Sequence, residues 1–251
     1  MRIVSLSPAM TEILYAIGAG DDVAAVTKFC DWPPLAKNKP KVGSLINTEP
    51  EKINELKPDL IVASYFMPRV LKQCSDLPKL LILEPKNLWD VFESIRLIGE
   101  AVGRFQEAEK VVREMKDGFD EILSLMTGDS ARVYMEEWYD PPTAAGYWVP
   151  ELVAIAGGEE VIAEVGQPSQ AFSLAAMNIA DPDIIVCHWW GWGERFDPRR
   201  LIDRPGWENL RAVSENKVFF VNEALINRPS PRLVEGAHKL ERIFSGAIKD
   251  I

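Results

Sequence analysis

Aromatic side chains are concentrated in one short segment of this chain. Trp189, Trp190 and Trp192 lie in a glycine-containing loop that follows a predicted apolar strand at 184–187. Such a loop offers little room to bury three indoles together, which favours an exposed apolar surface that meets a ligand. For each tryptophan taken alone, packing beneath the loop is an equally good interpretation.

Further aromatic residues follow other predicted strands and could extend this surface. They are Phe29, Trp32, Tyr65, Phe66, Trp138, Tyr139 and Trp148. Planar side chains with few rotatable bonds cover a flat molecule at a low entropic cost. The set therefore predicts a binding site for a large flat ligand, such as a corrin or a porphyrin.

Support for metal ligation or catalysis is weaker. Neutral imidazole can be an axial ligand of cobalt or iron, so His188 is a candidate contact to the metal of a bound chelate, although one histidine after a buried strand is usually structural. The sequence contains no Gly-x-Ser-x-Gly elbow, phosphate-binding glycine loop or His-Glu-x-x-His pattern. Glu136, Glu137 and Asp140 could do acid–base chemistry, but solvated or capping carboxylates are the simpler interpretation. We predict no catalytic residue and no intrinsic cofactor.

The elements that position these residues are typical of parallel α/β structure. In the first half, predicted strands at 2–6, 23–26 and 60–63 alternate with predicted helices at 13–17 and 49–56. In such folds ligands bind at the carboxyl ends of the strands, where the aromatic residues occur.

A long helical stretch divides the chain. Apolar residues recur every three or four positions from Leu88 to Thr127, with a break expected near Gly99 to Gly103. The pattern then repeats, with strands predicted at 132–135, 184–187 and 218–221 and helices at 148–156 and 231–248. The two halves look similar, but we find no strict sequence repeat. We predict an N-terminal α/β lobe at 1–87, an interlobe helix at 88–128 and a C-terminal α/β lobe at 129–251; the alternative is two helices within one ordinary domain.

The composition is that of a globular protein with an acidic surface. Of 251 residues, 47% are hydrophobic and 26% are charged, with a net charge of −10. That charge disfavours nucleic acids and anionic membranes as partners, and no apolar run approaches the ~20 residues of a membrane helix. Cys30, Cys74 and Cys187 lack metal-site spacing, and Cys30 is best explained as a small buried thiol. A monomer is expected.

Short motifs also occur in an informative order. The first half contains Leu6-Ser7-Pro8, Asp31-Trp32-Pro33-Pro34 and Leu56-Lys57-Pro58-Asp59, and the second contains Trp148-Val149-Pro150-Glu151, Arg204-Pro205-Gly206-Trp207 and Asn227-Arg228-Pro229. In order and spacing they resemble the helical-backbone substrate-binding proteins of cobalamin, haem and siderophore importers. These are class III periplasmic binding proteins, and the cobalamin-binding branch is the nearest.

This resemblance implies a fold and a function. The fold would be two parallel-sheet α/β lobes joined by a helical spine, with the ligand held in a cleft between them. The function would be non-catalytic binding of cobalamin or another corrinoid for an ABC importer, with haem or a ferric siderophore as alternatives. By the same resemblance Arg228 reaches the ligand, where its guanidinium could bond amides or phosphate, and Glu51 docks on a permease.

Two positions depart from the family's pattern. Ala175 stands where a second docking glutamate is expected, and Leu45 stands where the cobalamin receptor has an aromatic ligand contact. Three further interpretations therefore stay open: a cytoplasmic corrinoid carrier or sensor, an enzyme that processes corrinoids or metal chelates, and a protein whose aromatic loop binds another protein. The first predicted strand begins at residue 2, so we expect a cytoplasmic protein if the sequence is complete and a periplasmic one if a leader was removed.

Overall fold

The computed structural model describes residues 1–44, 47–64, 79–126, 128, 130–191, 197 and 199–248. Leu45, Tyr65, Phe66, Cys74 and Trp192 therefore lie outside the described residues. The chain divides into two compact units. Unit 1 comprises Met1–Pro85 and Trp89–Glu114, and unit 2 comprises Lys86–Leu88 and Met115–Ile251.

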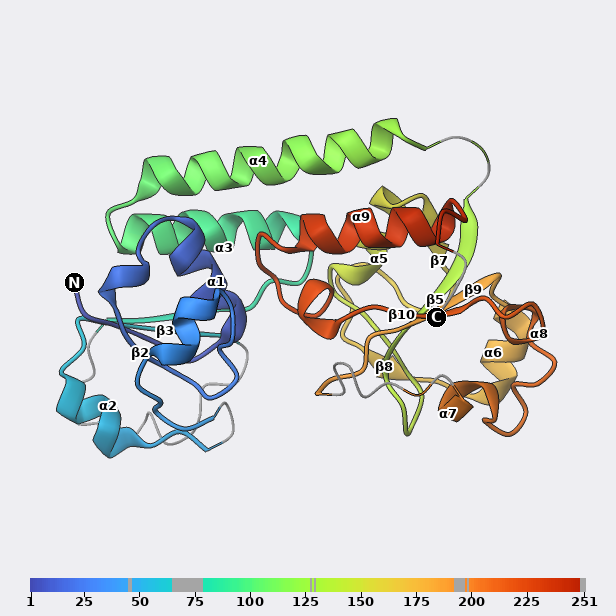
Figure 1. The fold of residues 1–251 in the computed structure, drawn as a ribbon, viewed down its shortest axis with the longest axis horizontal. Coiled ribbons are helices and arrows are strands. Elements are labelled where there is room, and N and C mark those ends of the chain that lie inside the picture. The colour runs from blue at the N-terminus through green and yellow to red at the C-terminus, as the bar shows by residue number, and fades with distance from the viewer. Residues whose placement is uncertain are drawn as a thin grey trace. The chain divides into compact units, whose positions relative to one another are not determined.

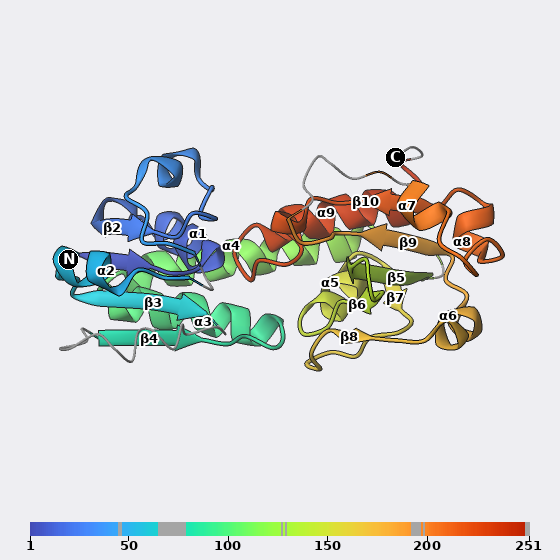
Figure 2. The ribbon, with the colours of Figure 1, turned by 90° about the horizontal axis from the view of Figure 1, so that it is seen from below.

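Unit 1 is built on a parallel sheet. Its order is β2-β1-β3-β4, and Figures 1 and 2 show these strands beside one another. The strands are β1 (Ile3–Ser5), β2 (Val23–Val26), β3 (Leu60–Ser64) and β4 (Lys79–Leu83), and the first helices are α1 (Pro8–Ala16) and α2 (Pro50–Leu56). Helix α1 begins at Pro8, earlier than the sequence predicted, because proline fits the first helical turn. Ile53 of α2 packs with Val4 and Ile61 in the core.

The predicted helical stretch is broken at the predicted place. Helix α3 (Leu88–Ala101) ends before Gly103, whose φ is 70°, and α4 (Phe105–Ser124) follows. The two helices meet closely at the corner, since a Cβ on Gly99 would lie 2.4 Å from the Ala108 side chain. Arg96 Nε donates to Glu109 Oε1 at 2.6 Å, which joins α3 to the first part of α4.

Unit 2 contains a larger mixed sheet. Its order is β10-β9-β5-β6-β8, and β7 also pairs with β5. The strands are β5 (Ala131–Trp138), β6 (Thr143–Ala144), β7 (Gly158–Glu160), β8 (Gln170–Ala171), β9 (Ile184–Cys187) and β10 (Val218–Phe220). The helices are α5 (Val149–Ile155), α6 (Leu174–Ala180), α7 (Arg199–Ile202), α8 (Arg211–Ser214) and α9 (Leu233–Phe244). Strands β7, β5, β9 and β10 are parallel neighbours, the same arrangement as β2, β1, β3 and β4 in unit 1.

The structure also reveals a local repeat that the sequence analysis did not recognise. Residues 49–64 and 173–188 correspond without a gap: a seven-residue helix, one left-handed residue, a proline, an aspartate and an apolar strand. The left-handed residues are Lys57, with φ 45°, and Asp181, with φ 37°. The two units therefore share one structural element as well as a strand order.

A matching set of hydrogen bonds holds this element in unit 1. Asp59 Oδ2 accepts from the Arg2 backbone N–H at 2.7 Å, and the Asp59 N–H donates to the Arg2 carbonyl at 2.8 Å. The Arg2 guanidinium donates to the Leu56 carbonyl at 2.7 Å. These bonds tie the end of α2 to the start of β1.

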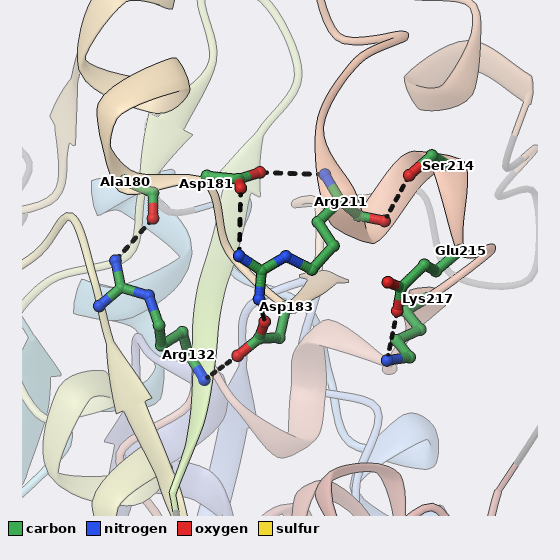
Figure 3. A network of polar contacts seen from close by, with 8 residues as sticks. All are labelled: Arg132, Ala180, Asp181, Asp183, Arg211, Ser214, Glu215 and Lys217. Atoms are coloured by element: carbon green, nitrogen blue, oxygen red, sulfur yellow. Dashed lines mark hydrogen bonds and ion pairs between the residues drawn. The ribbon is translucent and has the colours of Figure 1, made fainter.

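Unit 2 repeats the arrangement and reinforces it (Figure 3). Asp183 accepts from the Arg132 N–H at 3.2 Å, and the Arg132 guanidinium donates to the Ala180 carbonyl at 2.6 Å. Arg211 adds ion pairs to Asp183 at 2.5 Å and to Asp181 at 3.4 Å. This network ties together the amino ends of β5 and β9. The aromatic residues considered next follow the opposite, carboxyl ends of these strands.

Candidate functional site

The carboxyl ends of β5 and β9 bring the aromatic segments of unit 2 together. The strands are adjacent and parallel, and the His188 N–H donates to the Glu136 carbonyl at 2.9 Å, so the pairing continues one residue past β9. Tyr139 follows β5, and Trp189 and Trp190 come soon after β9. These residues are therefore neighbours at one edge of the sheet.

Two tryptophans at this edge are exposed, as the sequence predicted. Trp138 is 44% exposed and Trp190 is 47% exposed. Their indole N–H groups are nevertheless bonded, Trp138 to the Asp140 carbonyl at 2.8 Å and Trp190 to Glu137 Oε1 at 2.5 Å. An exposed ring whose polar atom is already held offers its face to an apolar ligand.

The prediction of an exposed surface is wrong for two other tryptophans. Trp189 is completely buried, because its indole N–H donates to Glu136 Oε1 at 2.8 Å and its ring packs on Tyr139 with centroids 5.1 Å apart. Trp148 is also buried, and its indole N–H donates to the Ile226 carbonyl at 2.9 Å. Trp189 belongs to a core cluster of unit 2 that includes Tyr134 and Trp207.

A buried ion pair lies next to Trp189. Arg204 donates to both carboxyl oxygens of Glu136, at 2.7 and 2.9 Å, and to the Tyr139 carbonyl at 2.9 Å. Its guanidinium lies over the rings of Tyr139 and Trp207, at 4.6 and 4.2 Å from their centroids. The interpretation of Glu136 as a solvated or capping carboxylate is therefore wrong. Its carboxyl group is buried, and the Tyr134 hydroxyl donates to it as well, at 3.0 Å.

His188 lies in the core of unit 2. The ring is completely buried, with Nδ1 and Asn227 Oδ1 2.5 Å apart, and Asn227 Nδ2 donates to the His188 carbonyl at 3.1 Å. Burial lowers the pKa of His188 to about 4, so the imidazole is neutral near pH 7. Within the described residues Nε2 has no hydrogen-bond partner and no cluster of three metal-ligating side chains occurs. The structural interpretation of His188 fits better than axial ligation. Arg228, which directly follows Asn227 in the sequence, is half-buried.

Unit 1 presents its own aromatic residues after β2. Phe29 is 53% exposed and Trp32 is 43% exposed. Cys30 between them is buried, and its thiol lies 3.2 Å from the hydroxyls of both Thr11 and Thr27. Burial raises the pKa of this thiol, which fits the predicted role of a small buried group.

Sequence reasoning missed one exposed aromatic residue of unit 1 and a hollow in unit 2. Trp89, at the start of α3 and therefore just beyond the carboxyl end of β4, is 60% exposed. Trp89 lies within the helical stretch predicted from Leu88, and no strand was predicted before it. The apolar run at 80–83, which forms most of β4, was the available signal. In unit 2 an open hollow of about 310 Å³ lies beside Tyr139, and charged side chains line the rest of it: Asp197, Arg199, Arg200 and Asp203.

Comparison with known proteins decides the family. The model of the family described as periplasmic binding protein matches residues 3–225. The chain belongs to the periplasmic binding protein family. It is 30% identical over 263 residues to an uncharacterized ABC transporter substrate-binding lipoprotein, YvrC, of Bacillus subtilis. The alignment covers 99% of this chain and 82% of the relative. It is 26% identical to the vitamin B12-binding protein of Vibrio cholerae over 95% of this chain and 87% of that protein.

Solved structures agree on the fold. The periplasmic heme-binding protein RhuT from Roseiflexus sp. RS-1 superposes with a TM-score of 0.85 over 98% of both chains, at 23% identity. The vitamin B12-binding protein BtuF of Vibrio cholerae superposes with a TM-score of 0.79 at 25% identity, over 99% of this chain and 98% of that one. The predicted class III periplasmic-binding-protein fold is confirmed.

Family membership also bears on activity and location. Members of this periplasmic binding protein family are binding proteins and not enzymes, so the expectation of a non-catalytic protein is confirmed. The family acts outside the cytoplasm, and YvrC is a lipoprotein; these findings give no support to the cytoplasmic alternative. Among the helices of the described residues, none has the length and apolar character that a membrane span requires.

Proposed function

We propose that this chain is the substrate-binding component of an ABC importer and that its ligand is a large planar metal chelate, with cobalamin or another corrinoid ahead of haem. The observation that carries the proposal is the exposure of aromatic rings after the strands of each unit. Phe29 and Trp32 follow β2, and Trp138 and Trp190 lie at the ends of β5 and β9. Flat rings held at the carboxyl edge of a sheet suit the face of a large planar ligand.

Two considerations favour a corrinoid. The relative that binds vitamin B12 is similar along 95% of this chain, whereas the similarity to RhuT, at 23% identity, extends to the fold alone. In addition, cobalamin carries its own axial base and needs no axial side chain from the protein. That chemistry fits a chain whose candidate axial residue, His188, is buried.

The proposal is tested by titrating the protein with cyanocobalamin, dicyanocobinamide and haemin while intrinsic tryptophan fluorescence is measured, with correction for absorbance by the ligand. We expect saturable quenching by the two corrinoids at low micromolar concentration or below. Saturation by haemin alone would change the proposed ligand from a corrinoid to haem. If none of the three compounds gives saturation, the proposal of a planar metal chelate fails.

The double variant Trp138→Ala/Trp190→Ala tests whether the exposed rings of unit 2 bind the ligand. We expect its affinity for cyanocobalamin, measured by calorimetry, to fall at least tenfold, because both exposed rings of unit 2 are lost. Phe105→Ala is the matched control: Phe105 is 48% exposed, but it follows α3, whose 14 residues span about 20 Å from Leu88. Equal affinity losses in both proteins would contradict the assignment.

Docking on the permease is a second part of the proposal. Glu51 and Glu55 are exposed one helical turn apart on α2, and neither forms an ion pair within the described part of the chain. The corresponding positions of α6 hold Ala175 and Ile179, and Ile179 is 85% exposed. We propose that α2 contacts cationic residues of the permease and that α6 contributes no such charge.

Reversing one charge tests the docking surface. Glu51→Lys is expected to weaken stimulation of ATP hydrolysis by a reconstituted permease complex about tenfold, since attraction would become repulsion. Ligand affinity should be unchanged. Glu164→Lys, the same charge change at another exposed glutamate, is the control. A Glu51→Lys protein that stimulates like the Glu164→Lys protein would remove α2 from the docking surface.

A further inference from the structure

Two consecutive glutamates of β5 hold two consecutive tryptophans after β9. Glu136 accepts from the Trp189 indole at 2.8 Å, and Glu137 accepts from the Trp190 indole at 2.5 Å. The register of β5 with β6 shifts between Glu136 and Trp138, at Glu137. The first pair is buried, with Glu136 and Trp189 both 0% exposed, while the second reaches the surface, where Trp190 is 47% exposed.

The outer pair is supported from two further segments of unit 2. The Ser169 hydroxyl donates to Glu137 Oε2, and the Gly146 N–H donates to Ser169 Oγ at 3.1 Å. Gly146 itself is tightly enclosed, because a Cβ there would lie 2.2 Å from the Gln167 carbonyl oxygen. A continuous series of hydrogen bonds thus runs from a tightly enclosed backbone position through Glu137 to an exposed ring.

This series of hydrogen bonds contributes little to the stability of the fold. The ring of Trp190 is half in solvent, so fixing its orientation contributes little to the hydrophobic core. A ring that is already oriented loses less conformational entropy when a ligand binds to it. The arrangement therefore serves recognition better than stability.

We infer that Glu137 is a positioning residue, which holds the Trp190 indole in the orientation that the ligand meets. The identity of the ligand rests on the proposed function. The hydrogen bonds that orient Trp190 do not depend on it. Glu137 acts through Trp190 and needs no contact with the ligand.

The test compares Glu137→Leu, which removes the acceptor of the indole N–H, with Glu137→Gln, which retains one. We expect Glu137→Leu to bind cyanocobalamin about tenfold more weakly, a change of about 1.4 kcal/mol, and Glu137→Gln to stay within threefold of the wild type. In 5-fluorotryptophan-labelled protein, the ¹⁹F resonance of Trp190, assigned with Trp190→Phe, should shift in Glu137→Leu. Ser169→Ala, which removes the support of Glu137, should shift it in the same direction by less.

A double-mutant cycle separates positioning from a general structural role. In the Trp190→Phe background, where no indole N–H remains, Glu137→Leu should cause no further loss of affinity. An equal loss in both backgrounds, or an unmoved Trp190 resonance in Glu137→Leu, would overturn the inference. If the wild type binds neither cyanocobalamin nor haemin, the proposed function fails, while the resonance still decides whether Glu137 orients Trp190.

Discussion

Replacing Arg204 by methionine is expected to lower the free energy of unfolding by about 3–5 kcal/mol, because it leaves the buried Glu136 carboxyl group without its cationic partner. Both side chains are withdrawn from solvent, Arg204 to 9% exposure and Glu136 to 0%. Two donors, Tyr134 and Trp189, would still reach the carboxyl oxygens, but neither carries a charge. Urea unfolding followed by circular dichroism measures the change.

Two further variants serve as controls for this measurement. Arg199→Met removes another arginine that is ion-paired, to Asp197 at 3.1 Å, but its side chain is 79% exposed, so no measurable loss is expected. Adding Glu136→Gln to Arg204→Met removes the stranded charge and should recover part of the stability. If Arg204→Met costs no more than Arg199→Met, the ion pair does not stabilise the edge of the sheet.

Local signals in the sequence were sufficient for the fold class. The apolar runs that became β3 and β9 are buried along nearly their whole length, as central strands of parallel sheets are. The break between α3 and α4 was likewise marked by Gly99 and Gly103. Such features depend on residues close together in the chain, and a pattern of residue types records them directly.

The burial of neighbouring tryptophans could not be predicted in the same way. Trp189 and Trp190 are the same residue type at adjacent positions, yet one is fully buried and the other is 47% exposed. Trp189 bonds the buried Glu136, whereas Trp190 bonds Glu137. Glu136 in turn pairs with Arg204, which is distant from it in sequence. No local pattern specifies that pairing.

The repeat was hidden for a different reason. Within the corresponding segments few residues are identical, among them Pro58 and Pro182, and Asp59 and Asp183. The equivalence lies mainly in backbone geometry, in the left-handed residue before each proline and in the bonds of each aspartate to an arginine on the neighbouring strand. A periodicity analysis does not detect such a correspondence.

His188 leads to the second prediction, a loss of stability on acidification. Burial lowers its pKa from 6.5 to about 4 in the folded protein. Between these values the unfolded chain binds a proton that the folded protein does not, so stability falls as the pH falls from 6.5 to 4. The shift corresponds to a loss of about 3 kcal/mol over this range, at most 1.4 kcal/mol per pH unit.

The control is His188→Asn, whose side-chain amide can still donate to Asn227 Oδ1 but does not titrate. Acidic groups elsewhere affect both proteins alike, so the difference between their unfolding free energies isolates the histidine. We expect the wild type to lose stability relative to His188→Asn as the pH is lowered from 6.5, with the difference levelling off below pH 4. Parallel pH profiles would mean that the imidazole takes up its proton in the folded state, which requires solvent or a ligand to reach Nε2. The same pair of proteins thus tests whether His188 belongs to the core or to the binding surface.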